Sequence, residues 1–315
     1  MRTSTIIISS GIIILLGFWV GIQISDRIQS QSDVAVKTDE IKTDTMKLQG
    51  KEIVYQPPSM EEVPEGPMGE AIKYGYKIVN ETNTVLDGYV GNELSCTSCH
   101  AGAGLDKDVS SLVGVSQKYP RYMPREGEIR TMEDRINGCM LRSMNGKEIP
   151  NDSEEMKAIL SYFHYISRGT PTGEDLPWLE LNNKDHIPTP NVEDGEDLYN
   201  QSCISCHAAD GSGTGANTGP ALWGGNSFND GAGMARMSKM TAYIQRNMPV
   251  GQENTLSDQE AANLAAYILS QDRPVWKEKM KDWPNGDRPN DIIDRDKREK
   301  IKNGTIEWDK VLNIK

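Results

Sequence analysis

The sequence contains few of the side chains from which a protein interior is built. Apolar residues make up 37% and aromatic residues 6% of its 315 residues, and phenylalanine occurs only 3 times. A chain of this length is long enough for two modest domains, but their cores would be lean if they consisted of side chains alone. We therefore expect a large bound group to complete the interior.

Positive charge is also in short supply. Lysine and arginine total 34 against 46 aspartates and glutamates, so the formal net charge is −12. This excess of negative charge disfavours nucleic acid and anionic lipid as partners of the molecule as a whole. We predict no nucleic-acid partner, and an anionic substrate would require a local cluster of arginines.

The N-terminus lacks the small residues that mark the cleavage site of an export signal, because the first alanine of the chain is Ala35. Residues 5–24 instead form a charge-free run of 20 residues, which is long enough to cross a bilayer as a helix. Arg2 places the N-terminus on the cytoplasmic side. We predict a transmembrane anchor at residues 1–25, a polar tether at 26–58 and an exported body. Cleavage of the same run as a signal is the alternative, and it also exports the body.

Cysteine is scarce, and four of the five cysteines belong to a repeated motif. The sequence CTSCH runs from Cys96 to His100 and returns as CISCH from Cys203 to His207. In the pattern C-x-x-C-H, two thiols one helical turn apart bond to the vinyl groups of a c-type haem, and the histidine binds the iron. A zinc ribbon is the alternative, but it leaves both histidines without a role. The sequence therefore predicts two covalently bound haem c groups, with cofactor-binding residues Cys96, Cys99, His100, Cys203, Cys206 and His207.

The surroundings of the two motifs repeat as well. Gly75 and Gly195 open similar segments ahead of the motifs, and each provides the small residue that a closely packed helix needs. After the motifs, the matching positions are the helix-capping serines Ser153 and Ser257 and, ten residues beyond each, Phe163 and Tyr267. We interpret this pattern as an internal duplication of one small helical haem domain.

The duplication predicts an all-α fold of two tandem cytochrome c-like haem domains behind the N-terminal helix and tether. The first domain spans residues 59–172 and the second spans 191–275, with a proline-rich linker at 173–190. Dense alternating charge in the tail, residues 276–315, indicates a segment that lies along the surface or remains mobile.

The duplication also suggests the second axial ligand of each iron. Met248 lies 41 residues after His207 and precedes a proline, where a c-type fold presents its thioether. The corresponding distance in the first repeat, 39 residues after His100, ends at Cys139. Met234, Met237 and Met240 compete with Met248, but their helical spacing is typical of packing residues. For the first haem, Met140 and Met144 are alternative ligands, and Cys139 is then a buried apolar filler.

Arginines gather around Cys139 although the chain as a whole is acidic. They are Arg125, Arg130, Arg135 and Arg142. Neighbouring acidic residues, namely Glu126, Glu128, Glu133 and Asp134, offer a simpler explanation, a solvated network of ion pairs. Sulfur bound to iron beside guanidinium groups is nevertheless suited to an oxygen- or sulfur-bearing anion.

Several segments resemble the dihaem thiosulfate dehydrogenase family, which also includes tetrathionate reductases. They are GNELSCTSCHAGAG, MPREGEI, DRINGCMLRSMNG, CISCHAADG, FNDGAGMARM and RNMPVG. DRINGCMLRSMNG is the specific segment, because the haem motifs alone are common to many cytochromes. The resemblance covers roughly residues 65–273 and leaves out the anchor, the tether and the tail.

The resemblance implies functional residues at positions of this chain. The implied metal ligands are His100 and Cys139 for the first haem, and His207 and Met248 for the second. The implied catalytic residues are Cys139, Arg125, Arg135 and Ser143. Asn247 precedes Met248, so we do not expect a lysine ligand there. The chain departs from many cytochromes c at one point: Pro220, whose carbonyl would hold His207, is matched in the first repeat by Ser110, which leaves the orientation of His100 open.

The reaction that the resemblance implies is the oxidation of two thiosulfates to tetrathionate, or the reverse reduction. Electrons would pass from the first haem (His/Cys) to the second (His/Met) and on to a soluble or membrane-bound partner, such as a cytochrome c or a terminal oxidase. We expect this on the periplasmic side of the cytoplasmic membrane. A non-catalytic membrane-anchored dihaem electron-transfer cytochrome is one alternative, and it predicts two methionine-ligated haems. A dihaem peroxidase or another sulfur-compound cytochrome is a second.

Overall fold

A computed structural model describes residues 44–48, 51–180 and 182–314 of the chain. The predicted anchor at residues 5–24 and most of the predicted tether lie outside these residues. Within the described ranges, the structure contains no helix that is both long and apolar enough to span a membrane.

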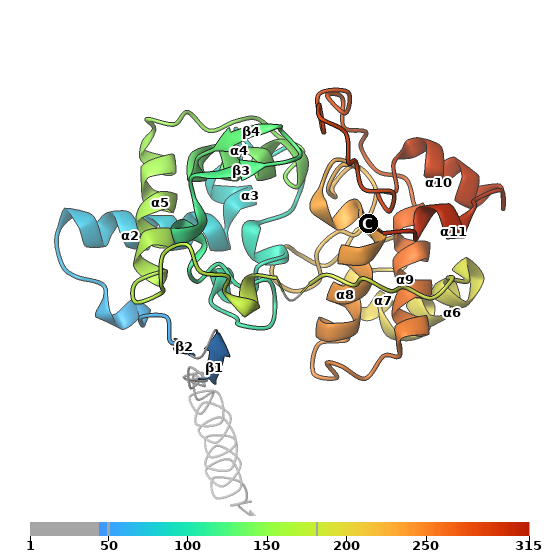
Figure 1. Cartoon of the computed structure of the whole chain (residues 1–315), viewed down its shortest axis with the longest axis horizontal. Coiled ribbons are helices and arrows are strands. Elements are labelled where there is room, and N and C mark those ends of the chain that lie inside the picture. Colours follow the sequence, from blue (N-terminus) through green and yellow to red (C-terminus); the bar gives the residue numbers. More distant parts are fainter. Residues whose placement is uncertain (1–43, 49–50, 181, 315) are drawn as a thin grey trace, which may run out of the picture. The chain divides into compact units, whose positions relative to one another are not determined.

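In the first repeat, a helix on each side of the haem motif forms a crossed pair (Figure 1). Helix α2 spans Pro67–Asn80 and helix α5 spans Glu154–Ile166. They meet at Gly75, where a Cβ atom would lie 2.0 Å from the carbonyl oxygen of Ala158. No side chain fits at this distance, so the predicted need for a small residue is confirmed.

The second repeat has the same crossed pair, formed by α6 (Val192–Ser202) and α9 (Asp258–Ser270) (Figure 1). A Cβ atom at Gly195 would lie 2.2 Å from the carbonyl oxygen of Asn263. The crossing therefore depends on glycine in both copies of the repeat.

The predicted N-caps are confirmed, but the match between the two final helices is displaced by one residue. The side chains of Ser153 and Ser257 accept hydrogen bonds from backbone N–H groups in the first turns of α5 and α9. At the crossings, the glycine of the first repeat faces Tyr162 and that of the second faces Tyr267. Tyr162 is thus the counterpart of Tyr267, and the predicted match of Phe163 with Tyr267 is wrong. The cap lies one residue further from the crossing in α9, which a count from the cap cannot detect.

The other helices are mostly short. The α-helices are α3 (Thr82–Val85), α4 (Met132–Arg142), α7 (Ile204–His207), α8 (Met237–Asn247), α10 (Arg295–Lys302) and α11 (Trp308–Val311). The 3-10 helices are η1 (Met60–Glu62), η2 (Cys96–Ser98), η3 (Gly102–Gly104), η4 (Val115–Lys118), η5 (Pro177–Leu179) and η6 (Gly233–Ala235). Helices α4 and α8 hold corresponding places, each between a haem motif and the final helix of its repeat.

Two antiparallel hairpins accompany the helices, so the fold is mainly helical and not all-α as predicted. Strand β1 (Asp44–Leu48) pairs with β2 (Lys51–Tyr55). Strand β3 (Arg121–Met123) pairs with β4 (Glu128–Arg130). Strands of three residues are too short to leave an alternating pattern in a sequence.

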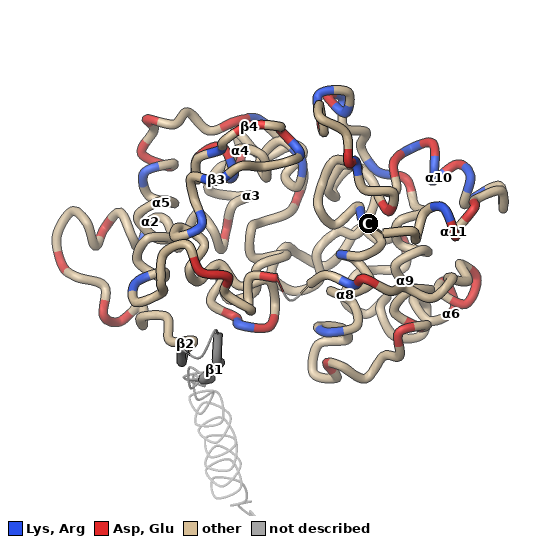
Figure 2. The backbone as a smooth tube through the Cα atoms, viewed as in Figure 1, with Lys and Arg blue, Asp and Glu red and all other residues tan. Residues whose placement is uncertain are grey.

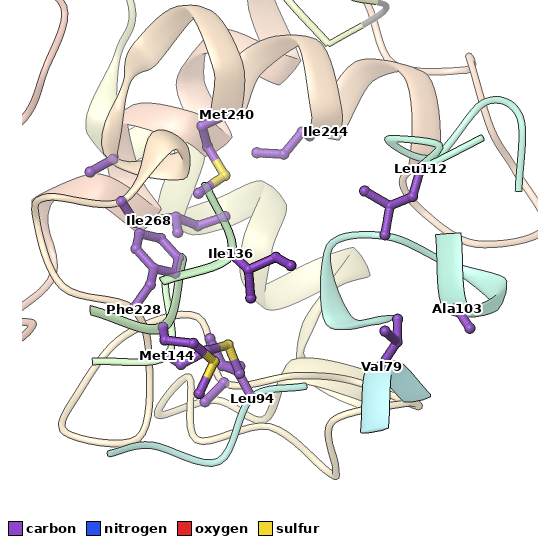
Figure 3. Close-up of a cluster of buried hydrophobic side chains, with 14 of the residues drawn as sticks. Val79, Leu94, Ala103, Leu112, Ile136, Met144, Phe228, Met240, Ile244 and Ile268 are labelled. Carbon is purple, nitrogen blue, oxygen red and sulfur yellow. The ribbon is translucent and has the colours of Figure 1, made fainter. Parts of the chain in front are cut away.

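Buried apolar residues of both repeats form one continuous cluster (Figure 3). Leu94 and Met144 come from the first repeat, and Phe228 and Ile268 come from the second. A smaller cluster includes Tyr55 and Trp178, whose rings are 5.0 Å apart and perpendicular. Because both side chains are buried, the end of the predicted tether and the middle of the predicted linker are packed parts of the protein.

The tail beyond residue 275 is also a packed part of the protein, which corrects the prediction of a surface or mobile segment. Ile293 is fully buried, and Arg298 is 2% exposed and forms an ion pair of 3.3 Å with Asp230 of the second repeat. Acidic and basic residues do alternate along α10 (Figure 2). The pattern was misleading because some of these charges have partners in the second repeat and the isoleucines between them face the core.

The glycine crossing makes a prediction about stability. Replacing Gly75 with alanine places a methyl group against a backbone oxygen, and the two helices must separate to admit it. We expect the free energy of unfolding to fall by about 3 kcal/mol. Denaturant unfolding of the haem-loaded protein measures this change. Gly88→Ala is the control, because a Cβ atom there meets no atom within 4 Å; equal stability of the two variants would contradict the close approach.

Candidate active site

The first haem motif begins in η2, which is tied to the end of the first crossed helix. The backbone N–H of Cys96 donates to Thr82 Oγ1 at 2.9 Å. His100 Nδ1 bonds to the carbonyl oxygen of Ser110 at 2.5 Å, and Ser110 adopts a left-handed conformation with φ of 53°. Asn182 of the linker donates to Ser110 Oγ at 2.6 Å. The serine carbonyl thus takes the place of the missing proline carbonyl and orients His100.

This hydrogen bond leaves the other ring nitrogen of His100 available to a metal. A carbonyl can only accept, so Nδ1 carries the proton and Nε2 carries a lone pair. Burial lowers the pKa of His100 to about 4, and the charge of Arg135 lowers it further, although the Ser110 carbonyl opposes this. The imidazole is therefore neutral near pH 7, as iron ligation requires.

The second motif is arranged in the same way. His207 Nδ1 bonds to the carbonyl oxygen of Pro220 at 2.8 Å, and burial lowers the pKa of His207. Met248 follows α8 directly and packs, partly buried, against the core. All five cysteines are free thiols. The two cysteine pairs and the two carbonyl-bound histidines fit two c-type haems.

Cys139 lies in the last turns of α4, one turn after Arg135. The Nη1 group of Arg135 donates to Cys139 Sγ at 2.7 Å. The charge of Cys139 raises the pKa of Arg135 above its ordinary value, more than burial lowers it. Burial raises the pKa of Cys96 to about 11 and of Cys99 to about 12, and the charge of Cys139 adds to both effects. Cys139 and Arg135 therefore lie close to the first haem motif.

The two proposed sulfur ligands hold different positions on their helices. Cys139 is inside α4, four residues before the C-cap Ser143, whereas Met248 is itself the C-cap of α8. Counting residues from the histidines brought them together although they are not structurally equivalent. The thiol is presented from a helix and the thioether from the residue after one.

Ser143 lies where the sequence predicted, one turn beyond Cys139. Its backbone N–H donates to the carbonyl oxygen of Cys139, and its own carbonyl accepts from Asn92 Nδ2 at 2.8 Å. Residues four apart on a helix share a face. Arg135, Cys139 and Ser143 therefore form one row along α4.

Arg125 is held away from this row by a residue that the sequence did not indicate. It lies in the turn between β3 and β4, and its Nη2 group donates to Asp282 Oδ2 at 3.0 Å. Its guanidinium lies over the ring of Trp283, 4.6 Å from the centroid. Glu126 connects it to the row, because the charge of this carboxylate acts on both Arg125 and Arg135. The three tryptophans of the tail were the only sequence signal for this contact.

The remaining two arginines differ from each other. Arg130 makes half-exposed ion pairs with Glu128 at 3.2 Å and Asp134 at 3.6 Å, as the solvated-network alternative predicts. Arg142 instead pairs with Glu126 at 3.1 Å and Asp282 at 2.9 Å, and its side chain is 12% exposed. The simpler explanation therefore applies to Arg130 and not to Arg142.

The motifs, the crossed helices and the carbonyl-bound histidines define a c-type cytochrome with two haem domains. Residues 89–172 match the family described as SoxA/TsdA, cytochrome c domain, and residues 190–268 match cytochrome c oxidase, cbb3-type, subunit III. The thiosulfate dehydrogenase of Psychrobacter arcticus is 40% identical over 239 residues, which cover 75% of this chain and 73% of that protein. The chain belongs to the thiosulfate dehydrogenase family, and its two domains carry two covalently bound haem c groups.

Other relatives agree. The thiosulfate dehydrogenase of Allochromatium vinosum is 37% identical, and the match covers 71% of this chain and 84% of that protein. Among solved structures, thiosulfate dehydrogenase (TsdBA) from Marichromatium purpuratum superimposes with a TM-score of 0.65 at 33% identity. That match covers 70% of this chain, which spans about half (49%) of the solved chain.

Proposed function

We propose that this protein oxidises two thiosulfates to tetrathionate with release of two electrons, and that it also catalyses the reverse reduction. The observation that carries the proposal is the contact of 2.7 Å between the Arg135 guanidinium and Cys139 Sγ beside the first haem motif. An ordinary electron-transfer cytochrome has no use for this pair. Membership of the thiosulfate dehydrogenase family supports the same substrate.

The haem ligands form part of the proposal. We assign His100 and Cys139 to the first haem, and His207 and Met248 to the second. When bound, the two haems supply one-electron redox chemistry and a route to an external acceptor, such as a cytochrome c or a terminal oxidase. Export of the body, anchored at the periplasmic face by residues 5–24, belongs to the proposal as well and is supported by the length of that apolar run.

The side chains of the site bring two mutually repelling dianions together. Arg135 and Arg125 supply positive charge that is already in place, which lowers the barrier more than charge that must be reorganised. Ser143 presents a hydroxyl to donate a hydrogen bond to a sulfonate oxygen. Because the charge of Cys139 raises the pKa of Arg135, this guanidinium stays positive over the physiological pH range.

Cys139 divides the sulfur coupling into two steps. In the first, its thiolate sulfur forms a bond with the outer sulfur of one thiosulfate, and two electrons leave to the haems. In the second, another thiosulfate attacks that outer sulfur, forms tetrathionate and releases Cys139 as a thiolate. The steps together consume two thiosulfates and release one tetrathionate and two electrons, and each step run backwards gives the reduction.

Turnover by the purified haem-loaded protein tests the proposal. We expect thiosulfate to reduce an added artificial acceptor with one tetrathionate formed per two electrons, and tetrathionate to oxidise a low-potential donor. Peroxide and sulfite are the comparison substrates. A protein that turns over peroxide or sulfite but not thiosulfate, or none of them, would contradict the proposed reaction.

A further inference from the structure

The carboxylate of Asp282 lies between two arginines of the first repeat, although Asp282 belongs to the C-terminal tail. It accepts hydrogen bonds from Arg125 Nη2 at 3.0 Å, Arg142 Nη2 at 2.9 Å and Trp276 Nε1 at 3.1 Å. The Asp282 side chain is 6% exposed. A buried carboxylate is costly unless it is paired, and here each of its oxygens has a cationic partner.

Aromatic rings from the tail complete the enclosure of both guanidinium groups. Arg125 lies over Trp283 at 4.6 Å and Arg142 lies over Trp276 at 5.1 Å. A cation over an indole face is stabilised by the ring quadrupole, more strongly when it is removed from water. Each arginine is therefore held both by the shared carboxylate and by a ring of the same tail segment.

The tail also grips the backbone that carries Arg125. The backbone N–H of Trp283 donates to the carbonyl oxygen of Arg125 at 2.6 Å. Two residues further on, a Cβ atom at Gly127 would lie 2.5 Å from Pro284 Cγ, so the tail closes directly over the β3–β4 turn. Since each strand of this hairpin has three residues, the hairpin contributes little stiffness of its own.

Two positive charges of the same cluster repel each other, and the counter-charge between them decides their position. The charge of Arg142 disfavours the charged form of Arg125, and Asp282 favours it. One nitrogen of Arg125 remains uncommitted: its Nε is buried and has no hydrogen-bond partner. The tail thus fixes one edge of this guanidinium while a donor on another edge stays free.

We infer that Asp282 is a positioning residue of the active site, which holds Arg125 so that its free donor meets the sulfonate group of the substrate. The C-terminal segment from Trp276 to Asn285 is then part of the substrate site although it carries no haem ligand. This inference rests on the proposed function and deepens it. Asp282 acts only through Arg125 and does not touch the substrate.

The test is Asp282→Asn in the full-length, haem-loaded protein. Asparagine keeps the shape and accepts from Trp276, but it removes the charge that holds the arginines. We expect KM for thiosulfate to rise about tenfold and kcat to change less than about twofold, because a binding contact is lost in ground and transition states alike. Asp282→Glu, which restores the charge, should recover part of the affinity. Glu278→Gln is the matched control, because Glu278 lies in the same segment, half exposed, and pairs only with Lys281.

A double-mutant cycle with Arg125→Ala separates positioning from a merely structural effect. In that background Asp282→Asn should change KM less than about twofold. An equal rise in both backgrounds, or an unchanged or lowered KM for Asp282→Asn alone, would show that Asp282 does not position Arg125. The proposed reaction would stand in either case if the wild-type protein turns over thiosulfate. A wild-type protein without thiosulfate turnover would overturn both.

A second variant keeps the test decisive if Asp282→Asn fails to retain its haems. Trp276→Phe preserves a ring beneath Arg142 and removes only the Nε1 hydrogen bond to Asp282. We expect KM to rise about threefold with full haem content. An unchanged KM in this variant would count against the positioning role.

Discussion

Replacing Cys139 with methionine should leave both haems attached and reduce thiosulfate oxidation and tetrathionate reduction by at least about 1,000-fold. Methionine can still ligate iron but has no thiolate, so it cannot form the bond to the outer sulfur of thiosulfate. It also leaves the guanidinium of Arg135 without the sulfur that it contacts at 2.7 Å. The loss should appear in kcat, because the covalent step itself disappears.

Steady-state turnover in both directions, together with haem content, measures this effect. The near-infrared charge-transfer band of the ferric first haem should change from a thiolate to a thioether type. Met140→Leu and Met144→Leu are the controls, since both methionines are buried and are the rival ligands. Full turnover by Cys139→Met, or loss of the band in a methionine variant, would remove Cys139 from the site.

Replacing Arg135 with alanine should lower kcat/KM for thiosulfate about 100-fold or more. The guanidinium neutralises the thiolate of Cys139 and the sulfonate groups of two dianions, and its contribution grows as the two anions approach. Because Arg135 is surrounded by protein, water cannot replace its charge at the same position. The effect should therefore appear in both KM and kcat.

The matched control for this variant is Arg130→Ala. Arg130 lies five residues before Arg135, and its partners Glu128 and Asp134 hold it in a more exposed network. We expect its removal to change kcat/KM less than about twofold. If the two variants behaved alike, the arginines would act as a general basic surface and not as a clamp. Lysine in place of Arg135 should recover only part of the rate, because it lacks the planar fork of donors.

The rival function, a non-catalytic electron-transfer cytochrome, is separated from the proposed one by the same residues. It predicts thioether ligation of both haems and no effect of Cys139 or Arg135 on any sulfur substrate. Sequence similarity to thiosulfate dehydrogenases over 75% of the chain favours the enzyme. Voltammetry of the adsorbed protein with thiosulfate and with tetrathionate would show which direction is faster.

Much of this molecule could be predicted because the relevant information is local in the chain. The C-x-x-C-H motifs are five-residue patterns, and the helix caps at Ser153 and Ser257 need only the next turn. Gly75 and Gly195 were recognisable because the repeat placed them at matching positions. Cys139 and Arg135 were recognisable because they are four residues apart on one helix.

Other features could not be predicted, because they depend on distances in space between remote residues. The one-residue displacement of Tyr162 against Tyr267 follows from where two helices cross. The carbonyl of Ser110 serves His100 because the backbone there turns to a positive φ and Asn182 holds the side chain. Neither leaves a pattern in residue type or spacing.

The sequence by itself determined the two haem sites and the catalytic row on α4, since covalent attachment and helical spacing act over a few residues. Only the tertiary structure decided the role of the tail. Its alternating charge indicated a solvated strap, but Asp282 and Arg125, 157 residues apart, meet in a buried ion pair. The physical reason is that charge patterning shows which residues need partners, whereas only folding, by removing both from water, selects the partner.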